Sequence, residues 1–143
     1  MTTTMQLVNK EVLLNLALGI VFDTEKKKIL ITKRSKSADV SGLMWCFPGG
    51  KIEYGEDLEK RLKEKIMEKT GLRVESLGAI FASTISHENK KMLSVYYLCE
   101  FVDGETKLCK EIDEVKWVSP EEIESHFGEK LHPSLKEYLM SLK

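Results

Sequence analysis

The chain has 143 residues, of which 42% are hydrophobic and 31% charged, and its formal net charge at pH 7 is −1. This length and composition are typical of one folded domain spanning residues 1–143 and exclude a disordered protein. The balanced charge argues against a protein that wraps a nucleic-acid backbone. Three cysteines without a CxxC pair argue against a disulfide or zinc framework and favour a reducing compartment.

The first apolar run extends from Val12 to Phe22 and is too short to span a bilayer. It has neither a basic segment before it nor a convincing cleavage site, so it is predicted to be a buried strand and not a signal peptide. A polar turn separates it from Lys28–Arg34, and the two strands are expected to form a hairpin. We therefore expect a soluble, cytoplasmic protein that does not enter the membrane.

The central part of the chain is expected to contain one helix and three strands. Pro48 and the glycines after it are predicted to end the first strand. Asp57 or Glu56 can cap the start of the helix, and Gly71 is well placed after its last turn. The predicted ranges are Leu43–Gly50 for the first strand, Asp57–Thr70 for the helix, and Arg73–Ser86 and Lys91–Val102 for the later strands, which are rich in β-forming residues.

The last third is expected to add a short strand, Val115–Ser119, and two helices. Ser119 as N-cap and Pro120 in the first turn predict the start of one helix. Leucines at helical spacing predict the other over His132–Lys143. The whole order of elements predicts an α/β fold in which helices pack on a mixed sheet.

Two faces are expected on the central helix. An apolar stripe with a spacing of four residues is expected to face the sheet; it consists of Leu58, Leu62 and Ile66. Glu64 and Glu68 lie on the far side, where Arg61 and Lys65 are close enough for ion pairs. A charged helix face is usually only solvated. The "PGG" turn before it, however, exposes backbone groups to a ligand, and Mg²⁺ prefers oxygen ligands shared with substrate phosphates.

The segment "GGKIEYGEDLEKRLKEKIMEKTGL" resembles the Nudix box, G-x5-E-x7-R-E-U-x-E-E-x-G-U, in which U is a bulky aliphatic residue. The matching positions are Gly50, Glu56, Ile66, Glu68, Gly71 and Leu72. The flanking "WCFPGG" and "EIDEVKWVSPEEI" are also similar to the family. The resemblance implies a Nudix-like α/β/α sandwich. It further implies Mg²⁺- or Mn²⁺-dependent hydrolysis of a nucleoside diphosphate linked to another moiety, such as a nucleotide sugar or ADP-ribose, and a possible homodimer.

This sequence departs from the box at three positions. The family's arginine is replaced by Glu64, the glutamate after it by Lys65, and the last glutamate by Lys69. A protonated lysine cannot ligate Mg²⁺ and repels it at close range. Three arrangements follow, and the residues leave all of them open.

In the first arrangement, one metal is held by Glu68, by the Gly49 or Gly50 carbonyl and by the substrate, and Glu111 is a second ligand or the base. In the second, Glu64 joins Glu68 as a shifted ligand pair. In the third, the lysines bind phosphates directly and hydrolysis is lost or very slow. The protein would then be a nucleotide-binding module.

Further candidates come from the rest of the chain. Arg34 and Arg61 are candidates for phosphate binding, and His87 is a spare candidate for the base. The lead-in to the box and "LHPSLKEYL" resemble the GDP-mannose mannosyl hydrolase branch, which works with a reduced box. That branch has a Gln-His pair where this chain has Glu111-Ile112. Removal of RNA caps is less favoured, because no basic, aromatic extension is present.

Overall fold

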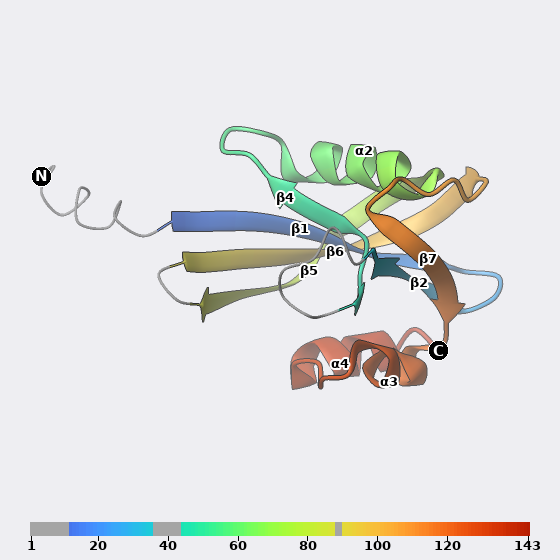
Figure 1. The fold of residues 1–143 in the computed structure, drawn as a ribbon. Helices are drawn as coiled ribbons and strands as arrows, with labels where there is room; N and C mark the ends of the chain where they lie inside the picture. Colours follow the sequence, from blue (N-terminus) through green and yellow to red (C-terminus); the bar gives the residue numbers. More distant parts are fainter. Residues whose placement is uncertain (1–11, 36–43, 88–89) are drawn as a thin grey trace, which may run out of the picture.

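A seven-stranded mixed sheet lies between helix α2 (Leu58–Thr70) on one face and helices α3 (Ile123–Phe127) and α4 (Pro133–Met140) on the other (Figure 1). The computed structural model describes residues 12–35, 44–87 and 90–143, and all structural statements refer to these ranges. The layers confirm the predicted α/β/α sandwich. Among the described helices, none is both long and apolar enough to cross a membrane.

The strands are β1 (Val12–Asp23), β2 (Lys28–Arg34), β3 (Trp45–Cys46), β4 (Gly49–Ile52), β5 (Leu72–His87), β6 (Lys90–Gly104) and β7 (Ile112–Val118). They follow the order β3-β2-β1-β6-β5, while β4 pairs with β1 and β7 pairs with β2. β1 runs parallel to β6 and antiparallel to β2 and β4, which makes the sheet mixed. The predicted hairpin and the two long strands after the helix are confirmed.

One strand prediction is wrong in part. The sequence predicts a single strand over Leu43–Gly50 that ends at the glycines, and Leu43 itself lies outside the described residues. The structure instead has the two-residue β3 and then β4, which begins at Gly49 opposite Leu18. Gly49 has φ +141°, and a Cβ there would lie 2.1 Å from the Ala17 carbonyl oxygen. Glycine therefore permits close approach to β1 and starts a strand here, rather than ending one.

Local signals explain where α2 begins and ends. The Asp57 side chain accepts a hydrogen bond from the Lys60 amide at 3.0 Å, as expected of an N-cap. Gly71 adopts the left-handed conformation, with φ 80°, and donates to the Met67 carbonyl. At the other end of the chain, Ser119 and Pro120 begin a 3-10 turn, η2 (Pro120–Glu122), which leads into α3.

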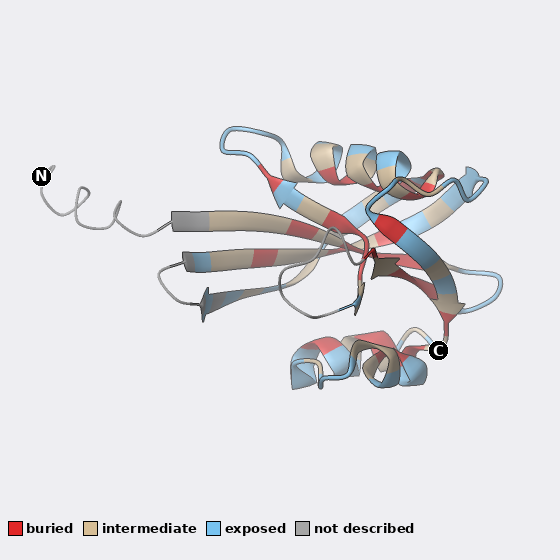
Figure 2. Cartoon of the chain, in the orientation of Figure 1, coloured by how far each residue is buried: buried red, intermediate tan, exposed pale blue. Residues whose placement is uncertain are grey.

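The core has two parts, one on each face of the sheet. Beneath α2, the fully buried Leu62 and Ile66 pack with Ala17 and Val21 of β1. On the opposite face, neighbouring β1 residues such as Ile20 pack with buried residues of α3 and α4. Buried positions therefore line the inner sides of the helices, as Figure 2 shows. This packing fixes α2 against β4, the strand with which it forms the candidate site.

Candidate functional site

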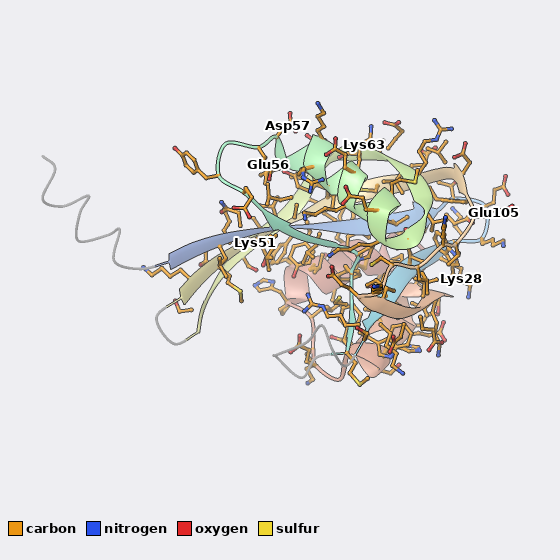
Figure 3. All side chains as sticks on the ribbon, turned by 45° about the horizontal axis from the view of Figure 1, so that its top comes forward. Lys28, Lys51, Glu56, Asp57, Lys63 and Glu105 are labelled. Carbon is orange, nitrogen blue, oxygen red and sulfur yellow. The ribbon has the colours of Figure 1, made fainter. Side chains whose placement is uncertain are left out.

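The loop between β4 and α2 is held by Glu56. Its carboxylate accepts a hydrogen bond from the Glu53 amide at 2.7 Å, and Arg61 Nε lies 3.1 Å from its other oxygen. Figure 3 labels Glu56 and Asp57 at this loop and Lys51 on β4. Of the two predicted capping residues, Asp57 therefore caps the helix, and Glu56 bonds the backbone of the loop before it. One carboxylate oxygen of Glu56 bonds the backbone and the other contacts an arginine. Glu56 therefore fixes the loop that leads into α2.

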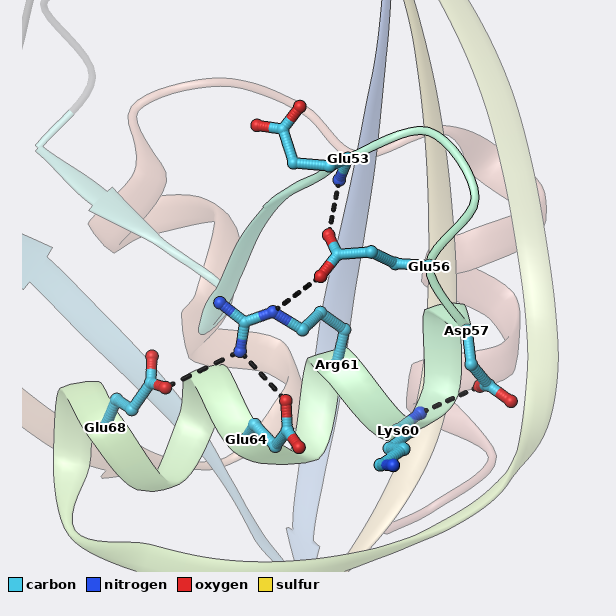
Figure 4. Close-up of polar contacts among 7 residues, drawn as sticks. All are labelled: Glu53, Glu56, Asp57, Lys60, Arg61, Glu64 and Glu68. Carbon is cyan, nitrogen blue, oxygen red and sulfur yellow. Dashed lines mark hydrogen bonds and ion pairs between the residues drawn. The ribbon is translucent and has the colours of Figure 1, made fainter.

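Arg61 gathers three carboxylates on one side of α2 (Figure 4). Besides Glu56, its guanidinium contacts Glu64 at 3.0 Å and Glu68 at 3.5 Å. The hydrogen bond to Glu64 is the main cause that raises the pKa of Arg61. These contacts confirm the ion pairs expected of Arg61, whereas among the described ion pairs none joins Lys65 to either glutamate. In consequence, Glu64 and Glu68 face an arginine, and they line a hollow of about 440 Å³ with Lys63, Met67, Arg73 and Val74.

Lys69 lies on the side of α2 that faces β4. Its ammonium donates a hydrogen bond of 2.7 Å to the Gly49 carbonyl, and the side chain is part-buried. Burial lowers the pKa of Lys69 below its ordinary value; Glu111 acts in the opposite direction, and Lys65 and Arg34 lower the pKa further. Lys69 is therefore within electrostatic reach of three charged groups from α2, β2 and the loop before β7.

These groups surround a pocket that we call the basic pocket, with a volume of about 310 Å³. Its lining residues are Leu16, Arg34, Gly50, Lys51, Lys65, Lys69, Glu111 and Ile112. Among these described residues, four are cationic and only Glu111 is acidic. Arg34 comes from the end of β2, and Lys51 comes from β4. The pocket thus collects positive charge from separate parts of the chain, as an anion-binding site requires.

The loop before β7 brings Glu111 to this pocket. The amides of Lys107 and Cys109 donate to the carbonyls of Thr70 and Lys69, at 2.8 and 3.2 Å. These bonds satisfy carbonyls at the end of α2 that have no partner within the helix. The Glu111 carbonyl in turn accepts from the Ser35 amide at 2.9 Å. Glu111 is therefore placed by contacts on both sides, although its side chain is exposed.

The structure separates the predicted site residues into two sets. Arg34, Gly50, Lys65, Lys69 and Glu111 meet at the basic pocket, and the Gly49 carbonyl is bonded to one of its lysines. The other set, Arg61, Glu64 and Glu68, forms the ion-pair cluster already described. The side chain of His87 lies outside the described residues.

Lys51 is a lining residue that the sequence reasoning missed. Lys51 is the second residue after Gly49 and lies on β4. The sequence predicts that the strand ends at the glycines, and therefore does not place Lys51 beside the site.

The predicted metal ligands do not fit a magnesium ion in this arrangement. In the described ranges, no group of three or more histidine, cysteine or acidic residues is placed to hold a metal. The Gly49 carbonyl already accepts from an ammonium, and Glu68 contacts Arg61. Mg²⁺ requires nearly octahedral oxygen ligands, whereas lysines stand at two of the box positions. The metal roles of Glu68, Gly49, Gly50 and Glu111 stay a prediction.

Comparison with known proteins places the chain in a family. The model of the NUDIX domain matches residues 13–140. The 8-oxo-dGTP diphosphatase of Buchnera aphidicola is 37% identical over 84 residues, which are 59% of this chain and 61% of that protein. The ADP-ribose pyrophosphatase of Methanocaldococcus jannaschii is 34% identical over 84 residues, 56% of this chain and 47% of that protein. The chain therefore belongs to the Nudix hydrolase family, which confirms the predicted class of enzyme.

A solved structure supports the same assignment at the level of the fold. The MutT protein of Methanosarcina mazei Go1 superposes with a TM-score of 0.75 at 22% identity, covering 93% of this chain and 94% of that one. The sequence matches to the two diphosphatases cover less than two thirds of either relative. Membership of the family and the sandwich fold are thus established, and the substrate is a matter for proposal.

Proposed function

We propose that this protein hydrolyses a nucleoside diphosphate linked to another moiety and binds the diphosphate in the basic pocket. The observation that carries the proposal is the convergence of four cationic side chains and one carboxylate on a single pocket. Phosphate oxygens form strong charge-assisted hydrogen bonds with guanidinium and ammonium groups. The volume of about 310 Å³ lies at the lower end of ligand pockets, which suits the diphosphate and leaves the rest of the substrate outside.

The chemistry that suits these residues is attack by water on one phosphorus. The bond between this phosphorus and the bridging oxygen breaks, which gives a nucleoside monophosphate and the phosphorylated second moiety. Glu111 takes the proton of the attacking water, as a general base. Arg34, Lys65 and Lys69 stabilise the charge that develops on the phosphate oxygens. The roles of these residues rest on their position around the pocket.

Two narrower possibilities concern the same pocket. If the resemblance to GDP-mannose mannosyl hydrolases holds, water attacks the sugar C1 and a C–O bond breaks. If Lys65 and Lys69 have removed activity, the protein is a nucleotide-binding module. The two relatives act, by their names, on 8-oxo-dGTP and ADP-ribose. Because these substrates differ in base and in leaving group, the relatives support a diphosphate class and select no single member of it.

A turnover screen tests the proposal. The panel contains ADP-ribose, GDP-mannose, other nucleotide sugars, dinucleoside polyphosphates and nucleoside triphosphates, each with Mg²⁺, Mn²⁺ or EDTA. We expect turnover of at least one compound, and a loss of about 100-fold in kcat for Glu111→Gln, since a general base contributes on this order. Glu114→Gln, an exposed change on β7, is the control and should leave kcat unchanged. Binding without any turnover would refute hydrolysis and leave the binding module.

The predicted Mg²⁺ or Mn²⁺ is tested by the same screen. A metal can use the predicted ligands only if Lys69 leaves the Gly49 carbonyl and Glu68 leaves Arg61. Turnover that requires Mn²⁺ and fails in EDTA would support the predicted metal dependence. The possible homodimer is a separate prediction, for which light scattering on the purified protein gives the molar mass.

A further inference from the structure

We propose that the Lys69 ammonium takes the place of a metal ion at the Gly49 carbonyl, so that the site binds a diphosphate without any divalent cation. This inference rests on the proposed function for the diphosphate ligand and for the basic pocket, and it does not depend on hydrolysis. A cation beside a backbone carbonyl and a phosphate neutralises charge, and an ammonium with three donors can bond to both oxygens at once. The bond of 2.7 Å between Lys69 Nζ and the Gly49 oxygen is the first half of that arrangement.

The space that Lys69 occupies depends on Gly50. A Cβ added at Gly50 would lie 3.0 Å from Lys69 Nζ and 3.5 Å from Lys65 Cδ. A side chain at this position would therefore press on the ammonium and on the stem of the neighbouring lysine. The box glycine thus leaves room for both lysines to lie across β4.

The charges around the pocket point in the same direction. The described residues of its lining have four cationic side chains against one carboxylate, which favours an anion and opposes a divalent cation. Meanwhile the carboxylates that the box retains are engaged elsewhere, since Glu56 and Glu68 both contact Arg61. The lysines and the arginine of the basic pocket therefore supply the positive charge that a metal would supply. The carboxylates around Arg61 are neutralised by its guanidinium.

Calorimetric titration with inorganic pyrophosphate tests this inference. The native protein is titrated in EDTA and again with Mn²⁺. We expect binding in EDTA, a Kd at least tenfold higher for Lys69→Met, and a weaker effect of the same sign for Lys65→Met. Lys63→Met is the matched control, because Lys63 lies on the same helix but pairs with Glu75 at 3.0 Å, and its Kd should stay within about twofold of native.

A second measurement reads the metal directly. Electron paramagnetic resonance of Mn²⁺, without pyrophosphate, should show no binding by the native protein and should show binding by the double variant Lys65→Glu/Lys69→Glu. Circular dichroism confirms that each variant is folded. Pyrophosphate binding that disappears in EDTA and returns with Mn²⁺ would overturn the inference, as would a Kd unchanged in both single lysine variants.

The two proposals fail in different ways. If pyrophosphate binds in EDTA and the screen finds no turnover, Lys69 replaces the metal and the proposed hydrolysis is wrong. If turnover occurs and depends on Mn²⁺, hydrolysis stands and the replacement is wrong.

Discussion

The substitution Gly49→Ala should destabilise the fold at the point where β4 meets β1. The new Cβ would lie 2.1 Å from the Ala17 carbonyl oxygen and 3.0 Å from Leu18 Cα, whereas ordinary contacts begin near 3.4 Å. Both neighbours are backbone atoms, so the strands themselves must separate. Overpacking of this kind costs about 1–3 kcal/mol, and a positive φ costs a side-chain-bearing residue about 1–2 kcal/mol more. We expect a loss of about 2–5 kcal/mol, out of a typical total of about 5–15 kcal/mol.

Urea unfolding followed by circular dichroism measures this loss, and Gly55→Ala supplies the comparison. Gly55 also has a positive φ, +88°, but nothing lies within 4 Å of the Cβ that would be added there. It should therefore lose only the conformational part, about 1–2 kcal/mol. The difference between the variants isolates the clash with β1. If both variants unfold at the same urea concentration with the same slope, the steric explanation for glycine at this position is refuted.

Three further predictions concern the helix and the core. Arg61→Gln should release the three carboxylates held by the arginine and create Mn²⁺ binding detectable by paramagnetic resonance; absence of a signal above that of Arg73→Gln would contradict this. Burial raises the pKa of the Cys99 thiol to about 12, so at pH 8 iodoacetamide should spare it in the folded protein, while equal labelling of all three cysteines would contradict its burial. Because the unfolded thiol ionises near pH 9.0 and the folded one does not, this group also makes stability fall as pH rises above that value. Ile66→Ala should cost about 2–5 kcal/mol in urea unfolding and Met67→Ala, which is 43% exposed, about 0.5 kcal/mol; equal losses would mean that the buried face of α2 is assigned wrongly.

Elements that depend only on residues close together in the chain could be predicted from the sequence. The bounds of α2 follow from a capping aspartate, an apolar stripe and a terminal glycine, all within one segment. β4 could not be predicted, because Pro48 and the glycines look like the end of a strand when only local signals are used. Its existence depends on pairing with Leu16 and Ala17, more than 30 positions earlier in the chain. Close approach of two backbones does not appear in a local pattern.

The site shows the same division. Helical spacing alone predicted that Arg61 pairs with the glutamates on its side of α2. Spacing could not place Lys69 against the Gly49 carbonyl, because this contact depends on how α2 crosses β4. The meeting of Glu111 with Lys69 depends in turn on a loop that is tied to the last carbonyls of the helix. The sequence therefore shows which face of a helix carries charge. Identifying what that face contacts requires the packed structure.

The irregular outer strand has a consequence for behaviour at high concentration. β5 ends the order of the sheet, and no described strand lies beyond it, so its outer edge presents unpaired backbone groups. Its pairing with β6 shifts register at three places: Arg73/Val74, Ser76/Gly78 and Ala79/Phe81. Bulges of this kind twist an edge and interrupt the flat ladder that a second chain would need. Although β5 is the longest of the described strands and exposes Leu77, its shape makes it a poor template for edge-to-edge aggregation.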